Sequence, residues 1–592
     1  MGDLLIPNTS RHDMVTYTIM INDKAVSPAY QVLSILVTKE INRIPSARIV
    51  FRDGEASERT FELSNTDEFI PGKKIMIKIG LDGENAQLFK GIIIKHAIKV
   101  KENGNGELVI ECRDDSIRMA VGRHSHYFEN VKDSDVFDEL IKKYAKYSLK
   151  ADVSSTKTKH KELVQHHISD WDFMLLRAEA NSMLVNVSDG VIKIAKPDSS
   201  ANAVLNLNYG SSILEFEAEM DARTQWKNVQ AYSWDYKNQD LFDAESSKAP
   251  FGEHGNLTAT ELANTIDLEK FEIRHSGHVL EQELKEWADS VMLRSRMAKI
   301  RGRAKFTGFS GVKPGDLVTL EGVGDRFKGK AFVTAVRHEM GNGMWDSHIQ
   351  FGLDPARYVF EHDDLNDGLA AGLSGGIHGL HTGKVVQLEN DPDGEDRILV
   401  KIPIIDNTAQ GIWTRVASLD AGSDRGAFFR PEIGDEVIVG FINDDPRDAV
   451  VLGMLHSSAK PAPIKAKDTN HEKGFTTRSK MHISFKDDTK TITIDTPGGN
   501  KIVLDESSMK IEIKDQNSNS ITMSPTGIKM ESPLQIDIKA GTVLTLGAGV
   551  SLAISGPSLS MKADASVSIE GASAKLAAQG PNVISGLPVM IN

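Results

Sequence analysis

Thr491-Ile492-Thr493-Ile494 and Lys510-Ile511-Glu512-Ile513 are two of several short stretches near the C-terminus in which apolar and polar residues strictly alternate. The alternation returns at residues 535–538, 551–554 and 566–569. A period of two is typical of a β-strand that buries one face. Turn-forming residues such as Gly, Pro and Asn separate the stretches. The spacing shortens from about ten residues to about eight toward the C-terminus, which indicates a solenoid-like array.

This array has no aromatic residue: the chain contains no Phe, Trp or Tyr from Lys486 to Asn592. A thin aliphatic strand face must be buried against another apolar layer, and no further apolar element follows Phe485. The simplest partner is the same segment of another copy. The sequence therefore predicts an intertwined β-prism, or β-helix, built from several chains. The side chains expected in its shared core are Ile511, Ile513, Ile536, Ile538, Leu544, Leu552 and Ile554.

Composition narrows the function classes. The 592-residue chain is long enough for several domains, and its net charge of −14 argues against a nucleic-acid partner. The single cysteine, Cys112, follows a strand-like run and is expected to be a buried packing residue. The N-terminus lacks the basic and apolar regions of a signal peptide, and no apolar run is long enough to span a bilayer. We therefore expect assembly in the cytoplasm, with delivery outside the cell by other proteins.

Two connectors divide the chain. Residues 366–382 are rich in glycine, and residues 457–474 contain prolines and scattered lysines. They predict three folded parts, at residues 1–365, 383–456 and 475–592. The whole is expected to be mainly β with a minor α component.

An internal repeat lies within the first part. One copy runs from Pro71-Gly72 through Phe89-Lys90-Gly91 to Gly104-Asn105-Gly106. The second copy repeats the three landmarks in the same order, at Pro314-Gly315, Phe327-Lys328-Gly329 and Gly341-Asn342-Gly343. Gly-Asn-Gly supplies the positive φ angles of a tight hairpin. The repeat predicts two similar β-barrels.

Helical signals interrupt the barrels. Residues 133–147 and 280–301 show helical periodicity, and Ser169 is expected to cap a helix that begins near Trp171. Residues 383–455 return to strand patterns, with five short apolar runs in a compact segment. Five strands of this kind predict an OB-like barrel.

The segments Arg397–Ile402, Ile412–Ala417 and Phe429–Val437, with Asp444-Asp445-Pro446-Arg447, resemble the VgrG spike proteins of type VI secretion systems. VgrG proteins are related to the baseplate hub and spike proteins of contractile phages. The run Ser169–Glu179 is similar to the hub-domain helix of this family. The resemblance follows the family's order along the whole chain: twin-barrel hub, OB-fold barrel, triple-stranded β-prism.

The resemblance implies a homotrimeric, structural spike of a contractile injection apparatus. Three chains with two barrels each would present six similar units to a sixfold inner tube. It also implies contacts with baseplate proteins, possible effector cargo, transient contact with a target membrane, and a PAAR-type tip protein at the C-terminus. The side chains expected to dock that tip are Leu587, Val589, Met590 and Ile591.

The sequence offers no convincing catalytic or metal-binding residues. His160, His166 and His167 with Glu162 lack metal-ligand spacing, and His124 and His126 are expected to be surface residues of one strand. We expect no enzyme activity, metal or cofactor. Two alternatives remain open: a phage-like tail adhesin, which usually displays aromatic residues for sugar stacking, and a glycan-cleaving tailspike, which needs clustered carboxylates. The C-terminal array offers neither feature.

Overall fold

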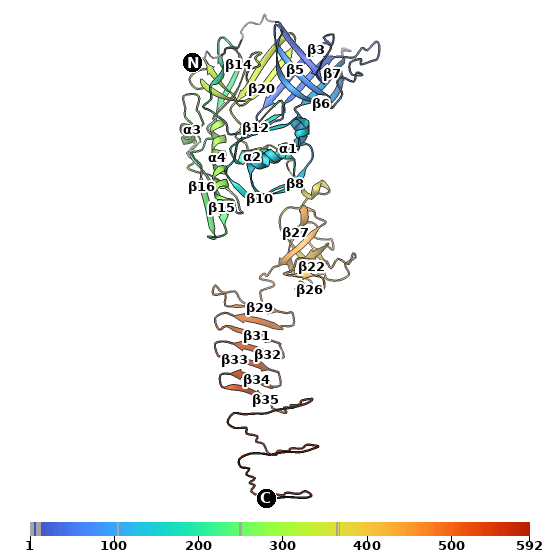
Figure 1. The fold of residues 1–592 in the computed structure, drawn as a ribbon, viewed down its shortest axis with the longest axis vertical. Coiled ribbons are helices and arrows are strands. Elements are labelled where there is room, and N and C mark those ends of the chain that lie inside the picture. Colours follow the sequence, from blue (N-terminus) through green and yellow to red (C-terminus); the bar gives the residue numbers. More distant parts are fainter. Residues whose placement is uncertain are drawn as a thin grey trace. The chain divides into compact units, whose positions relative to one another are not determined.

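The computed structural model describes residues 5–7, 14–102, 106–247, 251–362, 365 and 368–591. It is mainly β, as the sequence predicts, and it divides into two compact units, Met1–Gly453 and Met454–Asn592 (Figure 1). Within the described ranges, no helix is both long and apolar enough to cross a membrane.

The first unit is organised around a 13-stranded sheet. Its path runs β14-β18-β21-β20-β3-β4-β7-β6-β5-β1-β2, with β13 and β19 attached beside β20. The bounds of these strands are β1 Val15–Ile21, β2 Lys24–Ala25, β3 Val32–Glu40, β4 Ser46–Arg52, β5 Lys74–Leu81, β6 Glu84–Val100, β7 Gly106–Arg113, β13 Ala203–Asn208, β14 Ile213–Met220, β18 Ile300–Thr307, β19 Leu317–Glu321, β20 Gly329–Gly341 and β21 Met344–Phe351.

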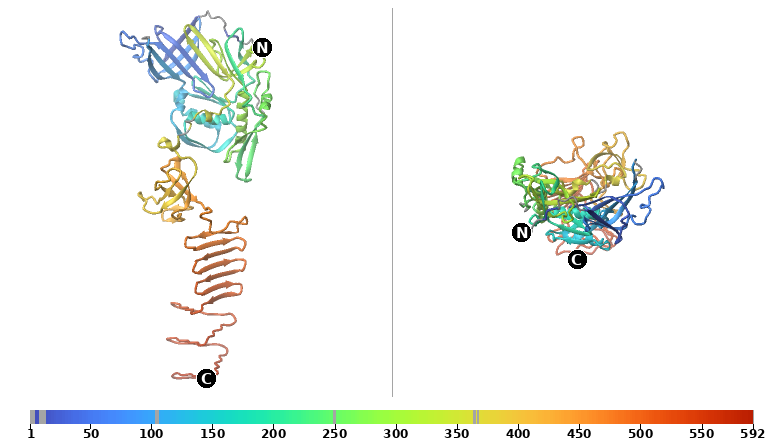
Figure 2. Two further views of the ribbon diagram at one scale, coloured as in Figure 1. Left: turned by 180° about the vertical axis from the view of Figure 1, so that it is seen from behind. Right: turned by 90° about the horizontal axis from the view of Figure 1, so that it is seen from above.

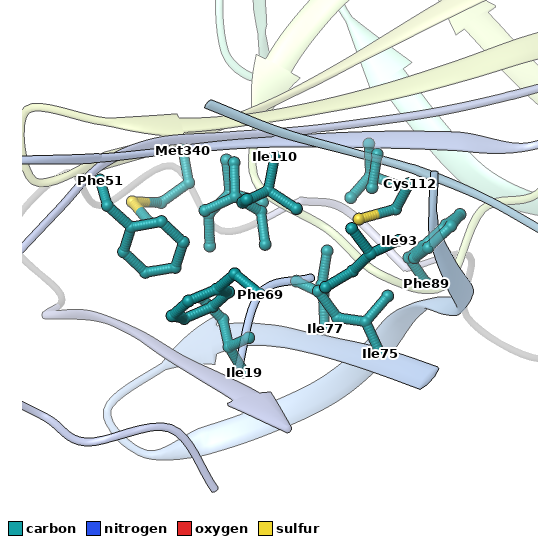
Figure 3. Close-up of a cluster of buried hydrophobic side chains, with 14 of the residues drawn as sticks. Ile19, Phe51, Phe69, Ile75, Ile77, Phe89, Ile93, Ile110, Cys112 and Met340 are labelled. Carbon is teal, nitrogen blue, oxygen red and sulfur yellow. The ribbon is translucent and has the colours of Figure 1, made fainter. Parts of the chain in front are cut away.

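The two predicted barrels appear as two halves of this sheet, each with its own apolar core. Cys112 lies in the first core and is buried, as expected (Figure 3). The halves repeat the same local hydrogen bonds: Gly72 N–H donates to Ile93 O at 2.8 Å, and Gly315 N–H donates to Val333 O at 2.8 Å. Both glycines have positive φ, at +97° and +94°, which explains why the turn requires glycine twice.

The Gly-Asn-Gly hairpin turns can be compared less fully between the two halves. Asn342 and Gly343 have positive φ and connect β20 to β21, as predicted. The corresponding residues Gly104 and Asn105 lie outside the described residues. The halves also differ at one edge, because β1 joins β5 antiparallel whereas β13 joins β19 parallel.

A mixed α/β segment lies between the two halves in the sequence. Its elements are β8 His124–Lys132, α1 Asp133–Lys142, β9 Lys150–Val153, β10 Lys159–Ile168, α2 Asp170–Ala180, β11 Leu184–Ser188 and β12 Val191–Ala195. Ser169 caps α2 as predicted, its Oγ accepting from Asp172 N–H at 3.0 Å. Helix α1 is shorter than predicted and ends at Lys142, before a 3₁₀ turn at Ala145–Tyr147.

A second insertion separates β14 from β18. It contains β15 Val229–Asp235, β16 Asp240–Glu245, α3 Ala259–Ile266, β17 Phe271–Arg274 and α4 Glu281–Met297. The apolar side of α4 packs on β15 through Leu284, Ala288 and Met292. A short α5, Tyr358–Glu361, follows β21.

The predicted OB-type barrel is present as a closed barrel of β22-β23-β24-β28-β27. Its bounds are β22 His381–Gln387, β23 Ile398–Lys401, β24 Ile412–Val416, β27 Glu436–Phe441 and β28 Ala449–Met454, and a two-stranded ribbon, β25 Ala421–Gly422 with β26 Arg425–Gly426, projects between β24 and β27. Buried aliphatic residues such as Ile398 and Val439 fill the interior.

The second unit begins with a seven-stranded antiparallel meander, seen from two sides in Figures 1 and 2. Its strands are β29 Glu472–Thr476, β30 His482–Lys486, β31 Thr491–Asp495, β32 Lys501–Asp505, β33 Lys510–Lys514, β34 Ser520–Ser524 and β35 Gly527–Glu531. Residues 532–591 continue without helix or strand.

Candidate functional site

The meander has one almost wholly apolar face. Directly paired residues of adjacent antiparallel strands point to the same side, so the strand registers define two columns across the sheet. One column is Phe475, Ile483, Ile494, Ile502, Ile513, Ile521 and Met530, and the other is Phe485, Ile492, Leu504, Ile511, Met523 and Ile528. We call these thirteen residues the apolar face.

The apolar face is open in a single chain. All of its members except the half-buried Ile521 are between 37% and 70% exposed. The opposite side of the same strands carries Ser, Thr, His, Lys, Asp and Glu, with Val503 as its one large apolar side chain. A contiguous apolar layer of this length is not stable against water and marks a surface that binds protein.

The chain beyond β35 has a second unusual property. The structure places bends at 533–534, 541–542, 549–550, 556–557, 564–565, 571–572, 579–580 and 587–588, so they recur every seven or eight residues. No backbone–backbone hydrogen bond joins any of residues 532–591 to the described part of the chain. Ser532 Oγ accepts from Leu534 N–H and Gln535 N–H, but this satisfies only two donors.

The strands predicted at 535–538, 551–554 and 566–569 are therefore not formed within one chain. The alternation of their side chains is present, but a strand needs a hydrogen-bonded neighbour, and this chain supplies none there. The predictions at 491–494 and 510–513 are confirmed as β31 and β33.

The predicted core residues divide between these two regions. Ile511 and Ile513 lie on the apolar face. Ile536, Ile538, Leu544, Leu552 and Ile554 lie in the unpaired segment, and all are exposed. The predicted tip residues Leu587, Val589, Met590 and Ile591 are also exposed; Asn592 lies outside the described residues.

The histidines considered as metal ligands have other roles. His160 is buried on β10, with Nε2 2.9 Å from Asp133 Oδ2. His166 and His167 are exposed on the same strand, and His124 and His126 are exposed on β8. Among the residues that the structure describes, no group of three His, Cys, Asp or Glu is arranged to hold a metal.

Sequence reasoning missed the ionic cluster around Asp133. Its carboxylate accepts from Arg177 Nε at 2.6 Å and from Asn181 Nδ2 at 2.9 Å, and Arg177 also donates to Glu283 at 2.8 Å. At the start of α1, Asp135 accepts from the N–H of Lys132, the N-cap residue. The cluster joins α1, β10, α2 and α4, elements too far apart in sequence for their pairing to be predicted.

Burial raises the pKa of Asp133, but the hydrogen bonds from His160 and Arg177 outweigh it and hold that pKa well below its usual range. The carboxylate is therefore ionised and serves as a structural anchor. Its hydrogen bonds to side chains of three other segments fit a packing role.

Three family models match the chain. Residues 11–342, more than half of its length, match the Alg8 N-terminal domain. Residues 381–456 match the type VI secretion system/phage-baseplate injector OB domain, and residues 491–580 match the phage baseplate V C-terminal trimerisation domain. The chain belongs to the Alg8 N-terminal domain family.

Curated relatives match over short segments. The type VI secretion system spike protein VgrG3 of Vibrio cholerae is 33% identical over 88 residues, which is 14% of this chain and 8% of the relative. VgrG1a of Pseudomonas aeruginosa is 30% identical over 73 residues, 12% of this chain and 11% of the relative. The matches thus span about a tenth of the length of these spike proteins.

Two solved structures are similar to this chain at low identity. The tail protein from Neisseria meningitidis has a TM-score of 0.43 and 13% identity, covering 58% of this chain and 98% of that one. The Francisella PdpA–VgrG complex has a TM-score of 0.38 and 9% identity, covering 88% of this chain and 80% of that one. The two C-terminal family models describe injector and phage-baseplate domains, and the trimerisation domain supports a trimer.

Proposed function

We propose that this chain forms the homotrimeric central spike of a contractile injection apparatus. The observation that carries the proposal is the second unit, where an open apolar face is followed by 60 residues, 532–591, without internal backbone pairing. Two further copies supply what is missing: three apolar faces bury one another, and the unpaired segments hydrogen-bond to each other.

The proposed roles of the domains follow their order along the chain. Residues 1–365 form the hub, 383–456 the OB barrel and 475–592 the spike, with linkers at 366–382 and 457–474. The hub contains two similar half-sheets, so three copies present six like surfaces to the inner tube protein. The spike carries a PAAR-type tip, contacts baseplate proteins, takes effector cargo with it, and is delivered out of the cytoplasm by the machine.

The first expected result concerns mass. The purified chain, of 64.9 kDa, should behave in solution as a species of three times that mass at micromolar concentration. Light scattering coupled to size-exclusion chromatography measures this directly. A folded monomer with an intact meander would refute the proposal, because its apolar face would then be stable in water.

The second expected result concerns the tip. Leu587, Met590 and Ile591 are exposed at the end of the chain, and a threefold axis would bring three copies of them together. Deleting residues 587–592 should leave the trimer mass unchanged and abolish capture of a PAAR-type tip protein in a pull-down. The matched control is replacement of the same six residues by a Gly/Ser sequence of equal length, which should also abolish capture. Undiminished capture by either variant would contradict the docking assignment.

A further inference from the structure

A cavity of about 510 Å³ opens on one side of the hub sheet. Residues of β14, β18, β21, β20 and β3 line it, together with residues of α4 and α5. Most of the lining side chains are charged or polar. The volume lies within the range of roughly 300–1,000 Å³ in which proteins hold small ligands. The polar lining indicates a ligand that carries charge.

One row of side chains crosses the five strands beside this cavity. Glu217 of β14 lies opposite Arg303 of β18, and Arg303 lies opposite Gln350 of β21. Ala335 of β20 lies opposite both Gln350 and Glu40 of β3. Directly paired residues of antiparallel strands point to the same side, so the five side chains share one side of the sheet.

The short side chain of Ala335 separates two long polar ones. Neighbouring strands lie about 4.8 Å apart, so the backbones of Glu40 and Gln350, two strands apart, are roughly 10 Å apart. Their side chains can therefore reach one small group above the Ala335 methyl. In the described part of the chain, neither Glu40 nor Gln350 has a side-chain hydrogen bond or an ion pair.

The arginines around the cavity are already paired. Each of the four that line it holds a carboxylate: Arg303 with Glu217 at 2.6 Å, Arg301 with Glu219 at 2.8 Å, Arg294 with Glu179 at 2.7 Å, and Arg43 with Glu361 at 2.9 Å. Asp354 also pairs with Arg301, at 2.6 Å. Among the described lining residues, Glu40 is thus the one carboxylate without an ion pair.

The surroundings of Glu40 disfavour its charge. Burial raises the pKa of this half-buried carboxyl group, Arg43 lowers it, and Glu361 raises it again, so that the pKa lies above its ordinary value. Arg43 compensates only in part, because its guanidinium group is hydrogen-bonded to Glu361 and lies 2.8 Å from His362 Nε2. A further positive charge beside Glu40 would stabilise the carboxylate.

The available acceptors fit an ammonium group. An ammonium group donates three hydrogen bonds, and the Glu40 carboxylate and the Gln350 amide oxygen can accept two of them. Calcium needs six or more oxygen ligands, and the described residues contain no group of acidic or histidine side chains arranged to hold a metal ion. The cavity is also larger than one ammonium group, so it has room for an attached methylene chain.

We propose that this cavity binds a primary alkylammonium group, with Glu40 as its counter-ion and Gln350 as a second acceptor. The ligand class is an amine on a flexible methylene chain, either a free polyamine or a lysine side chain of another protein. Every residue of the site belongs to residues 1–365 of one chain, so the inference does not rest on the proposed spike.

Isothermal titration of the full-length protein with spermidine tests the counter-ion. Glu40→Gln removes the charge but keeps the shape, and it should weaken binding roughly tenfold or more. The matched control is Glu339→Gln, which removes a charge from β20 outside the cavity lining, where Glu339 pairs with Arg337 at 3.1 Å. This control should leave the affinity almost unchanged. Equal losses in both variants would overturn the proposal, because they would indicate general attraction to a chain of net charge −14.

A second variant supplies the cation from within the chain. Gln350→Lys places an ammonium group within reach of Glu40, so it should abolish spermidine binding and raise the unfolding temperature of the hub. In a Glu40→Gln background the same change should no longer raise that temperature. Undiminished spermidine binding by Gln350→Lys would show that the cavity is not the site.

A peptide with one lysine in a Gly/Ser sequence distinguishes the two sources of the amine. Binding that depends on Glu40 supports the proposal with either probe. Spermidine alone would assign the site to free polyamines, and the peptide alone would assign it to a lysine side chain. If the wild-type chain binds neither probe, the proposal is overturned and the proposed spike is unaffected.

Discussion

Replacing Ile494 by aspartate should abolish the trimer. Ile494 lies in the middle of the apolar face, between Ile483 and Ile502 of the neighbouring strands. In a trimer the change buries three carboxylates without partners, at a cost of roughly 3 kcal/mol or more per copy. Sedimentation or light scattering should show monomers, and the cooperative unfolding of the spike should disappear. The same result is expected for aspartate at Ile513 or Ile536.

The adjacent residue provides the control. Thr493 lies on the polar side of the same strand, opposite Ser484 and Val503. Thr493→Asp introduces the same side chain one position away but leaves it in water, so the trimer mass and the unfolding temperature should hardly change. A stable trimer of Ile494→Asp, or equal damage from both variants, would show that the apolar face is not the buried one.

Replacing Asp133 by alanine should have the second largest effect, on the hub. The change leaves the half-buried side chain of Arg177 with only Glu283 as a carboxylate partner. It also removes the Asp133 oxygens that lie within hydrogen-bond distance of His160 and Asn181. Loss of one member of such a buried cluster costs about 3–5 kcal/mol. Thermal unfolding of the full chain, followed by tryptophan fluorescence, should show the hub transition at a markedly lower temperature.

Asp325→Ala is the matched control, because Asp325 pairs with Lys328 at 2.6 Å but both side chains are exposed. Its loss should leave the hub transition almost unchanged. Equal shifts for the two variants would contradict the anchoring role of Asp133.

The same cluster predicts a pH dependence. Because the folded-state pKa of Asp133 lies below the value of about 3.9 expected in the unfolded chain, its contribution is complete above that pH. The contribution is lost as the pH falls toward the folded-state pKa. Between pH 5 and pH 3, the difference in hub stability between wild type and Asp133→Ala should therefore narrow.

Local patterns in the sequence predicted most of the fold. Alternation identified β31 and β33, the Ser169 cap identified α2, and the repeated Pro-Gly and Gly-Asn-Gly landmarks identified the two hub halves. Each of these signals depends on residues close together in the chain. The pairing of β20 with β3 and the cluster of Asp133 with Glu283 depend on residues far apart, and no local pattern specifies them.

The apolar surfaces of the C-terminal region were also predicted from a local pattern. That pattern, too, does not specify which segments pair. The aliphatic alternation indicated that one strand face must be buried by another copy. It did not distinguish the meander, which forms within one chain, from residues 532–591, which do not. Side-chain periodicity is the same in both, and only the hydrogen-bond partners differ.

The absence of internal backbone pairing in residues 532–591 should also determine how fast this segment folds and unfolds. In the proposed trimer this segment cannot fold before three chains have met, so its formation should be slow and should depend steeply on chain concentration. Once formed, no strand can leave without breaking bonds to both neighbours. Its lifetime is then governed by the height of the unfolding barrier and not by an equilibrium with free monomers. For the proposed spike, which would bear a brief mechanical load, such kinetic stability matters more than a favourable equilibrium constant.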